Sequence, residues 1–227
     1  MTTASTRFDI VIPTVGRSSL AALLRSLERG DGPRPGRVVV VNDRRVDGRS
    51  PNATLALPVF DDLPVVVVAS GNGGRRGPAA ARNVGWRRCA APWIVFLDDD
   101  VVVPEDWTRR LVDDLERADD AGDSASQGRI VVPRRSDGRE RDAERSIVNL
   151  ERAAYITADM AVRRSALVAL DCRLYVVVRA GALLHAPAHG LCPELAEARP
   201  ARQAALFDDQ RPQRAHPVGP DLPRAVQ

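Results

Sequence analysis

Four short runs of mainly apolar residues constrain the fold of this chain more than any other feature. They occupy residues 8–13, 37–41, 65–69 and 93–97. The runs are nearly continuous in valine, isoleucine or leucine, and they lack the strict alternation of apolar and polar residues that marks a strand with one wet face. Such runs are typical of strands buried on both faces. We therefore predict an α/β fold with a mainly parallel sheet covered by helices on both faces.

Helix start and stop residues lie between these runs. Ser18 or Ser19 can cap a helix that places four leucines on one face and ends at Gly30. Pro78 is expected to begin a second helix, because proline is favoured at the first helical position. The remaining predicted elements are a helix at about 105–118, a strand at 128–133, a helix at 147–154, a short element at 156–160 and a helix at 163–170.

The charged residues narrow the possible functions. The chain contains no lysine, and its formal net charge is only +3. Without lysine, Walker-type phosphate binding and Schiff-base chemistry are excluded. Aromatic residues make up 4% of the chain, which leaves few stacking platforms for bases. We therefore expect no nucleic-acid partner.

The three cysteines and the lengths of the apolar segments indicate where in the cell the protein is expected. Cys89, Cys172 and Cys192 have no Cys-x-x-Cys spacing, so neither a zinc site nor a disulfide framework is indicated. The polar N-terminus has no apolar signal core, and the apolar runs are too short to span a bilayer. A cytoplasmic protein without a transmembrane segment is expected, with peripheral attachment to a membrane left open.

The run at 93–97 leads directly into three consecutive carboxylates, Asp98, Asp99 and Asp100. In open α/β sheets, ligands bind outside the carboxyl ends of the strands. Three adjacent carboxylates repel one another, and a divalent cation with a diphosphate behind it would relieve that repulsion. The alternative is a solvated acidic turn. The position of the triplet makes it a candidate metal site.

Polar residues also follow the earlier strands, with Thr14 after the first and Asp43 after the second. Residues 77–83 read Gly-Pro-Ala-Ala-Ala-Arg-Asn, and residues 96–100 read Phe-Leu-Asp-Asp-Asp. This set of motifs resembles the N-terminal half of glycosyltransferase family 2, the inverting nucleotide-sugar transferases with a GT-A fold. The resemblance covers about residues 8–170.

The resemblance implies roles for four residues in a nucleotide pocket. Thr14 and Asp43 would line the pocket, with Asp43 accepting a hydrogen bond from the base. Arg82 would reach the nucleotide or its phosphates. Asp98 would contact the ribose.

The resemblance also implies a metal ion, Mn²⁺ or Mg²⁺, at a DxD motif. Asp100 would hold this ion, with Asp99 as a competitor for the same role. Residues 156–164 resemble the family segment that lies under the donor sugar and the acceptor. There Asp159 would bind sugar hydroxyls as a catalytic residue, and the alternative is an acid favoured by a helix N-terminus.

The implied reaction moves a sugar, with inversion, from a nucleoside-diphosphate sugar to the hydroxyl of a saccharide, a lipid or a small molecule. Residues 1–170 would form the nucleotide-sugar-binding domain. Family members then continue with a Gly-Gly-Phe-Asp-Glu-like turn and a Glu-Asp pair that carries the general base. No such pair follows Leu170, so the general base stays unassigned. We expect residues 171–227 to be an atypical tail, a truncated or frameshifted acceptor part.

Two other functions fit parts of the sequence. Without the Glu-Asp pair, the chain could be a catalytically impaired relict or an accessory protein that binds a nucleotide sugar without turning it over. A lesser alternative is an NAD-dependent oxidoreductase. Residues 71–77 follow a predicted strand, precede a predicted helix and match a loose Gly-x-Gly-x-x-x-Gly pattern, and Asp98 would then hold a ribose.

Overall fold

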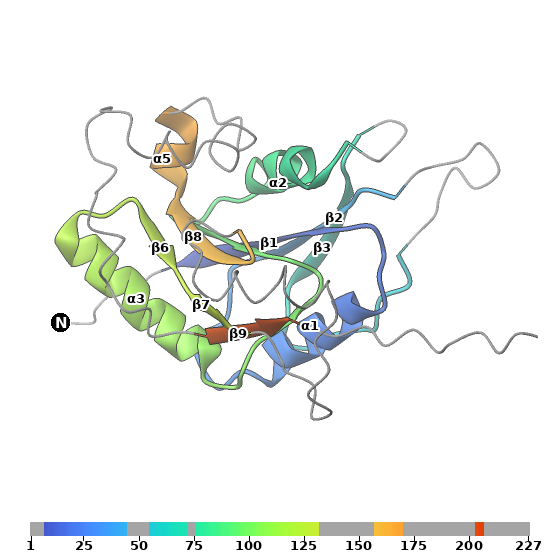
Figure 1. Ribbon diagram of the computed structural model, residues 1–227, viewed down its shortest axis with the longest axis horizontal. Coiled ribbons are helices and arrows are strands. Elements are labelled where there is room, and N and C mark those ends of the chain that lie inside the picture. Colours follow the sequence, from blue (N-terminus) through green and yellow to red (C-terminus); the bar gives the residue numbers. More distant parts are fainter. Residues whose placement is uncertain (1–6, 45–54, 72–75, 132–156, 170–202, 207–227) are drawn as a thin grey trace, which may run out of the picture.

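The computed structural model describes residues 7–44, 55–71, 76–131, 157–169 and 203–206. Its centre is a six-stranded sheet with the strand order β3-β2-β1-β4-β8-β6 (Figure 1). The strands of this sheet are β1 (Phe8–Thr14), β2 (Val38–Asn42), β3 (Val65–Ala69), β4 (Trp93–Leu97), β6 (Ala125–Gln127) and β8 (Asp159–Arg163). Strands β1 to β4 pair in parallel, whereas β8 runs antiparallel to both β4 and β6. The predicted mainly parallel sheet is confirmed.

Helices cover both faces of the sheet, as predicted. The helices are α1 (Ser19–Arg29), α2 (Pro78–Trp86), α3 (Trp107–Ala121) and α5 (Arg164–Ala169). Helices α2 and α5 lie on one face and α1 and α3 on the other (Figure 1). Along β1, Ile10 and Ile12 belong to the core under α1 and α3, and Val11 belongs to the core under α2. Since successive strand residues point to opposite faces, an unbroken apolar run supplies both cores.

The strand order creates a switch point beside β1. The chain passes from β1 to β2 and β3 on one side, and then returns to place β4 on the other side of β1. In open α/β sheets, ligands bind at such a point, in the crevice outside the carboxyl ends of the strands. Thr14 ends β1 and Asp98 follows β4, so both residues lie at this edge.

Helix α2 packs very closely on the sheet at Gly85. A Cβ atom added there would clash with Val11 Cγ1 and would lie 2.9 Å from Val41 Cγ2. Only a residue without a side chain fits between the helix and these valines. Arg82 is three residues earlier and therefore on the same face of the helix. The close approach at Gly85 thus brings Arg82 against the sheet.

Several element boundaries differ from those predicted. Strand β7 (Arg129–Val131) starts one residue after the start predicted for the strand at 128–133, whose last two residues lie outside the described residues. It belongs to a second small sheet with β5 (Val101–Val102) and β9 (Gln203–Leu206). Strand β8 replaces the short element predicted at 156–160. The helix predicted at 147–154 lies outside the described residues. No helix in the described part of the chain is both long and apolar enough to cross a membrane.

Candidate functional site

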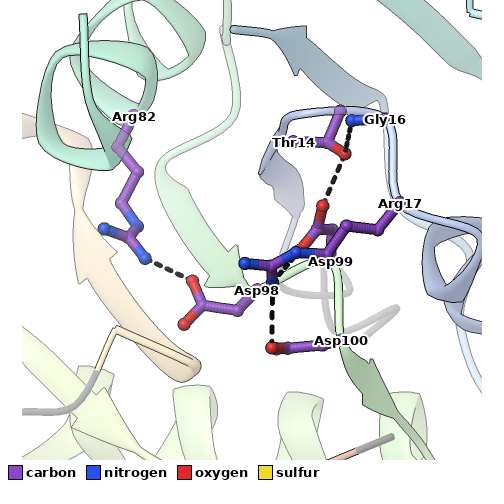
Figure 2. A network of polar contacts seen from close by, with 7 residues as sticks. All are labelled: Thr14, Gly16, Arg17, Arg82, Asp98, Asp99 and Asp100. Carbon is purple, nitrogen blue, oxygen red and sulfur yellow. Dashed lines mark hydrogen bonds and ion pairs between the residues drawn. The ribbon is translucent and has the colours of Figure 1, made fainter. Parts of the chain in front are cut away.

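The three aspartates that follow β4 point in different directions, and Asp99 and Asp100 share one partner, Arg17 (Figure 2). Phe96 packs in the core under α2. By strand alternation Asp98 continues on that face, and its carboxylate forms an ion pair with Arg82 of α2. Asp99 points to the end of β1, where Thr14 lies. Asp100 faces the side chain of Arg17.

The Arg82–Asp98 pair anchors one side of this site. The side chain of Arg82 is 7% exposed and that of Asp98 is 32% exposed. Within the described part of the chain, Arg82 Nε is buried without a hydrogen-bond partner. Because a buried arginine needs a counter-charge, this pair fixes the orientation of both side chains. Asp98 keeps an exposed edge toward the site.

Asp99 is the most deeply held member of the triplet. Its residue is 5% exposed, and its Oδ2 accepts a hydrogen bond of 2.5 Å from Thr14 Oγ1. The same hydroxyl accepts a 2.8 Å hydrogen bond from the backbone N–H of Gly16. Asp99 is therefore tied to the loop that follows β1, across the switch point of the sheet.

Arg17 bridges the carboxylates of Asp99 and Asp100. Its Nη1 lies 3.1 Å from Asp99 Oδ1 and 3.1 Å from Asp100 Oδ2. Burial raises the pKa of Asp100, the charges of Asp98 and Asp99 raise it further, and Arg17 opposes the shift. Three carboxylates face only two guanidinium groups, so the cluster retains a net negative charge.

Asp43 lies at the same edge of the sheet, after β2. Its backbone N–H donates to Thr14 O at 2.8 Å. Its carboxylate accepts three hydrogen bonds, from Ser70 Oγ at 2.5 Å and from the backbone N–H groups of Arg76 at 2.8 Å and Gly77 at 2.9 Å. Asp43 thus holds the backbone that enters α2 against the end of β3. A hydrogen bond to a nucleotide base would be additional to these three.

Asp159 begins β8 and pairs with Leu97 in the sheet, one position before the triplet. Its side chain is fully buried, and Oδ2 accepts a hydrogen bond of 3.2 Å from Trp107 Nε1 of α3. The carboxylate therefore faces the core under α3. In this conformation it is not open to a sugar hydroxyl.

The arrangement fits a divalent cation at the triplet. Asp99 Oδ1 and Asp100 Oδ2 already converge on one positively charged nitrogen, Arg17 Nη1. Oxygen ligands of this kind suit Mg²⁺ or Mn²⁺. In the part of the chain that the structure describes, no group of three or more His, Cys, Asp or Glu side chains is arranged to hold an ion. A cation held by these two carboxylates would take further ligands from water or a bound diphosphate.

The structure thus brings together Thr14, Asp98, Asp99, Asp100 and Arg82 from distant parts of the sequence. Sequence analysis did not find Arg17. Its position was informative, because it follows β1 by three residues at the edge where the triplet was expected. The role of the Arg76 and Gly77 backbone amides was also missed, since an amide contact has no side-chain signature.

Comparison with known proteins identifies the family. Residues 9–171 match the family model of glycosyl transferase family 2. The chain belongs to this family. The predicted family and the GT-A fold are confirmed. No match to the chain is found among curated proteins.

Solved GT-A glycosyltransferases share the fold at low sequence identity. TarS residues 1–349 from S. aureus are 19% identical, with a TM-score of 0.50 over 73% of this chain and 49% of that chain. The same TarS segment in complex with UDP-GlcNAc is 18% identical, with a TM-score of 0.50 over 73% of this chain and 47% of that chain. The mannosyltransferase PcManGT from Pyrobaculum calidifontis, in complex with GDP-Man and Mn²⁺, is 23% identical, with a TM-score of 0.51 over 74% and 47%. This family 2 chain therefore matches about half the length of these proteins.

Proposed function

We propose that this family 2 chain binds a nucleoside-diphosphate sugar at the switch point between β1 and β4, and transfers the sugar with inversion to an acceptor hydroxyl. The observation that carries this proposal is the convergence of Asp99 and Asp100 on one positively charged atom, Arg17 Nη1, which lies 3.1 Å from an oxygen of each carboxylate. The acceptor would be a saccharide, a lipid or a small molecule. Family membership favours sugar transfer over the NAD-dependent alternative.

Asp100 and Asp99 are the proposed ligands of Mn²⁺ or Mg²⁺. A bound divalent ion would neutralise charge on the departing diphosphate. Asp99 suits a fixed ligand, because Thr14 holds its other oxygen at 2.5 Å. Asp100 suits an adjustable ligand, because its side chain is 36% exposed.

The nucleotide roles of the remaining residues are proposed as follows. Asp98 would accept a hydrogen bond from the ribose with its exposed edge, while Arg82 holds its other side. Arg82 would thus act through Asp98, and would reach the phosphates only by leaving this pair. Thr14 and Asp43 would shape the pocket, Asp43 through the backbone amides of residues 76–77. Its contact with the base stays a prediction.

A catalytic role of Asp159 stays a prediction. Because the side chain is fully buried against Trp107, direct contact with a sugar requires a local rearrangement. The division at residue 170 and the cytoplasmic location, with peripheral membrane attachment left open, also stay predictions.

A second candidate function is binding of the nucleotide sugar without turnover. It is supported by the lack of a Glu-Asp pair after Leu170. A general base contributes roughly 10²- to 10⁴-fold to rate, so its loss would leave binding intact while transfer becomes slow.

Release of the nucleotide product tests both candidates. UDP-GlcNAc and GDP-Man, the donors in the neighbouring structures, would be incubated with the protein and Mn²⁺, with and without pooled saccharide and lipid acceptors. Release of UDP or GDP by wild type, and its loss in Asp100→Ala, supports the transferase. Metal-dependent binding of a donor without release supports the second candidate. Binding of neither donor contradicts both.

A further inference from the structure

Arg17 contacts both Asp99 and Asp100 through a single nitrogen. One guanidinium nitrogen, Nη1, lies 3.1 Å from an oxygen of Asp99 and 3.1 Å from an oxygen of Asp100 (Figure 2). These two aspartates are the proposed metal ligands. A metal ion bound to the same two oxygens would lie close to this guanidinium, and the two positive charges would repel each other. The metal ion and Arg17 would therefore compete for Asp99 and Asp100.

Arg17 and Arg82 differ in their freedom to move. Arg82 is 7% exposed and is pinned by α2 packing on the sheet, whereas Arg17 is 50% exposed and lies on the loop between β1 and α1. The pair with Asp100 is exposed on both sides, at 50% and 36%, and such pairs are weak because both partners can return to water. Asp99 is buried, so when Arg17 leaves, Asp99 needs another positive charge. Arg17 can therefore leave the cluster when another cation replaces it, and Arg82 cannot.

The charges of the cluster are compatible with replacement of Arg17 by a divalent cation. With both arginines in place, the three carboxylates and the two guanidinium groups together carry one net negative charge. When Arg17 leaves, the three carboxylates and Arg82 together carry two net negative charges. One divalent cation would balance this charge. A diphosphate bound to that cation would bring new negative charge beside the released guanidinium, and arginine pairs well with phosphate oxygens.

We propose that Arg17 is a built-in counter-cation that competes with the metal and so couples metal binding to nucleotide binding. Metal alone must displace Arg17 and leave it unpaired. Metal with a nucleoside diphosphate displaces Arg17 and gives it a new partner. By linkage, the nucleotide then raises metal affinity more than it would in a protein without Arg17. This inference rests on the proposed nucleotide and metal site.

Calorimetric titration of MnCl₂ tests the exchange, without nucleotide and with saturating UDP or GDP. The variant is Arg17→Gln, which removes the charge and keeps most of the side-chain length. The control is Arg109→Gln. It removes the same charge from an exposed ion pair with Asp31, 3.3 Å apart, whose two side chains are 58% and 49% exposed.

Arg17→Gln is expected to bind Mn²⁺ alone roughly three- to tenfold more tightly than wild type, because the ion no longer has to displace a guanidinium from Asp99 and Asp100. The factor by which the nucleotide raises Mn²⁺ affinity should fall in Arg17→Gln and stay unchanged in Arg109→Gln. Unchanged or weaker Mn²⁺ binding by Arg17→Gln, or an equal gain in Arg109→Gln, would overturn the role of Arg17 while leaving the proposed function intact. Binding of neither nucleotide to any of the proteins would overturn the proposed function and this inference with it.

Discussion

Thr14 donates a 2.5 Å hydrogen bond to Asp99 Oδ2 from the far side of the switch point, 85 residues away in sequence. The two residues end or follow neighbouring parallel strands, β1 and β4. Because Asp99 is almost fully buried, this donor satisfies a carboxylate oxygen that water cannot easily reach. The contact joins Thr14, a proposed residue of the nucleotide pocket, to Asp99, a proposed metal ligand.

Replacing Thr14 with valine is therefore expected to destabilise the protein. The variant keeps the shape and removes the donor, which leaves a buried carboxylate oxygen unsatisfied, at a cost of about 1–3 kcal/mol. Thr14→Ser keeps the hydroxyl and should cost less. Urea denaturation of the two variants compares the costs, and equal stability of Thr14→Val and wild type would contradict the importance of this bond.

Asp43→Asn should reduce the affinity for the nucleotide. The amide keeps one oxygen acceptor and turns an N–H₂ group toward backbone donors at residues 76 or 77, so the entry to α2 must shift. Ser70→Ala is the matched control, because it removes only one of the three donors. The measurement is UDP and GDP affinity by calorimetry. A loss in Ser70→Ala as large as that in Asp43→Asn would contradict the role given to the backbone amides.

Gly85→Ala should lower both stability and nucleotide affinity. The added Cβ would clash with Val11, so α2 must move away from the sheet, at a cost of about 1–3 kcal/mol. Arg82 would move with the helix. Gly122→Ala is the control, since Gly122 has φ +76° and no atom within 4 Å of an added Cβ. It should lose about 1–2 kcal/mol from backbone strain and keep full nucleotide affinity. Full affinity in both variants would contradict the link between Gly85 packing and Arg82.

Asp100→Asn is expected to make the metal-free protein more stable at neutral pH. Burial and the neighbouring Asp98 and Asp99 raise the pKa of Asp100 above 3.8, so the fold disfavours its ionised form. The stability that Asp100 contributes is fully present below the unfolded pKa and is lost as pH rises through the folded value. The advantage of the variant should therefore shrink as pH falls toward 3.8. Thermal unfolding in EDTA across this range measures it, and a variant less stable than wild type at neutral pH would show that the ion pair with Arg17 dominates.

Most of the sheet follows from local sequence. The strands at 65–69 and 93–97 have the predicted bounds, and the leucine-faced helix ends at Arg29, one residue before Gly30. These elements have continuous apolar runs or clear stop residues, which fix their limits locally. Strand β8 was not predicted as such, because its pairing with β4 is a contact between residues 62 or more positions apart. Tertiary pairing decides such segments.

The sequence predicted where the site lies in the fold, but not which side chains contact one another in it. Residues at strand ends were expected at one edge, and Thr14, Asp43 and the triplet lie there. The partners of each side chain depend on how helices and loops pack, so the Arg17 bridge and the Arg82–Asp98 pair could not be derived. The burial of Asp159 follows from Trp107, which α3 places beneath β8.

The most direct test of the proposed function is calorimetric titration of UDP, and then GDP, into wild type and Asp100→Ala, each with and without Mn²⁺. The proposal predicts that wild type binds one of the two nucleotides in a Mn²⁺-dependent manner and that Asp100→Ala loses the dependence on Mn²⁺. Binding of neither nucleotide, or equal binding by both proteins with and without Mn²⁺, would contradict a metal-assisted nucleotide site at the acidic triplet.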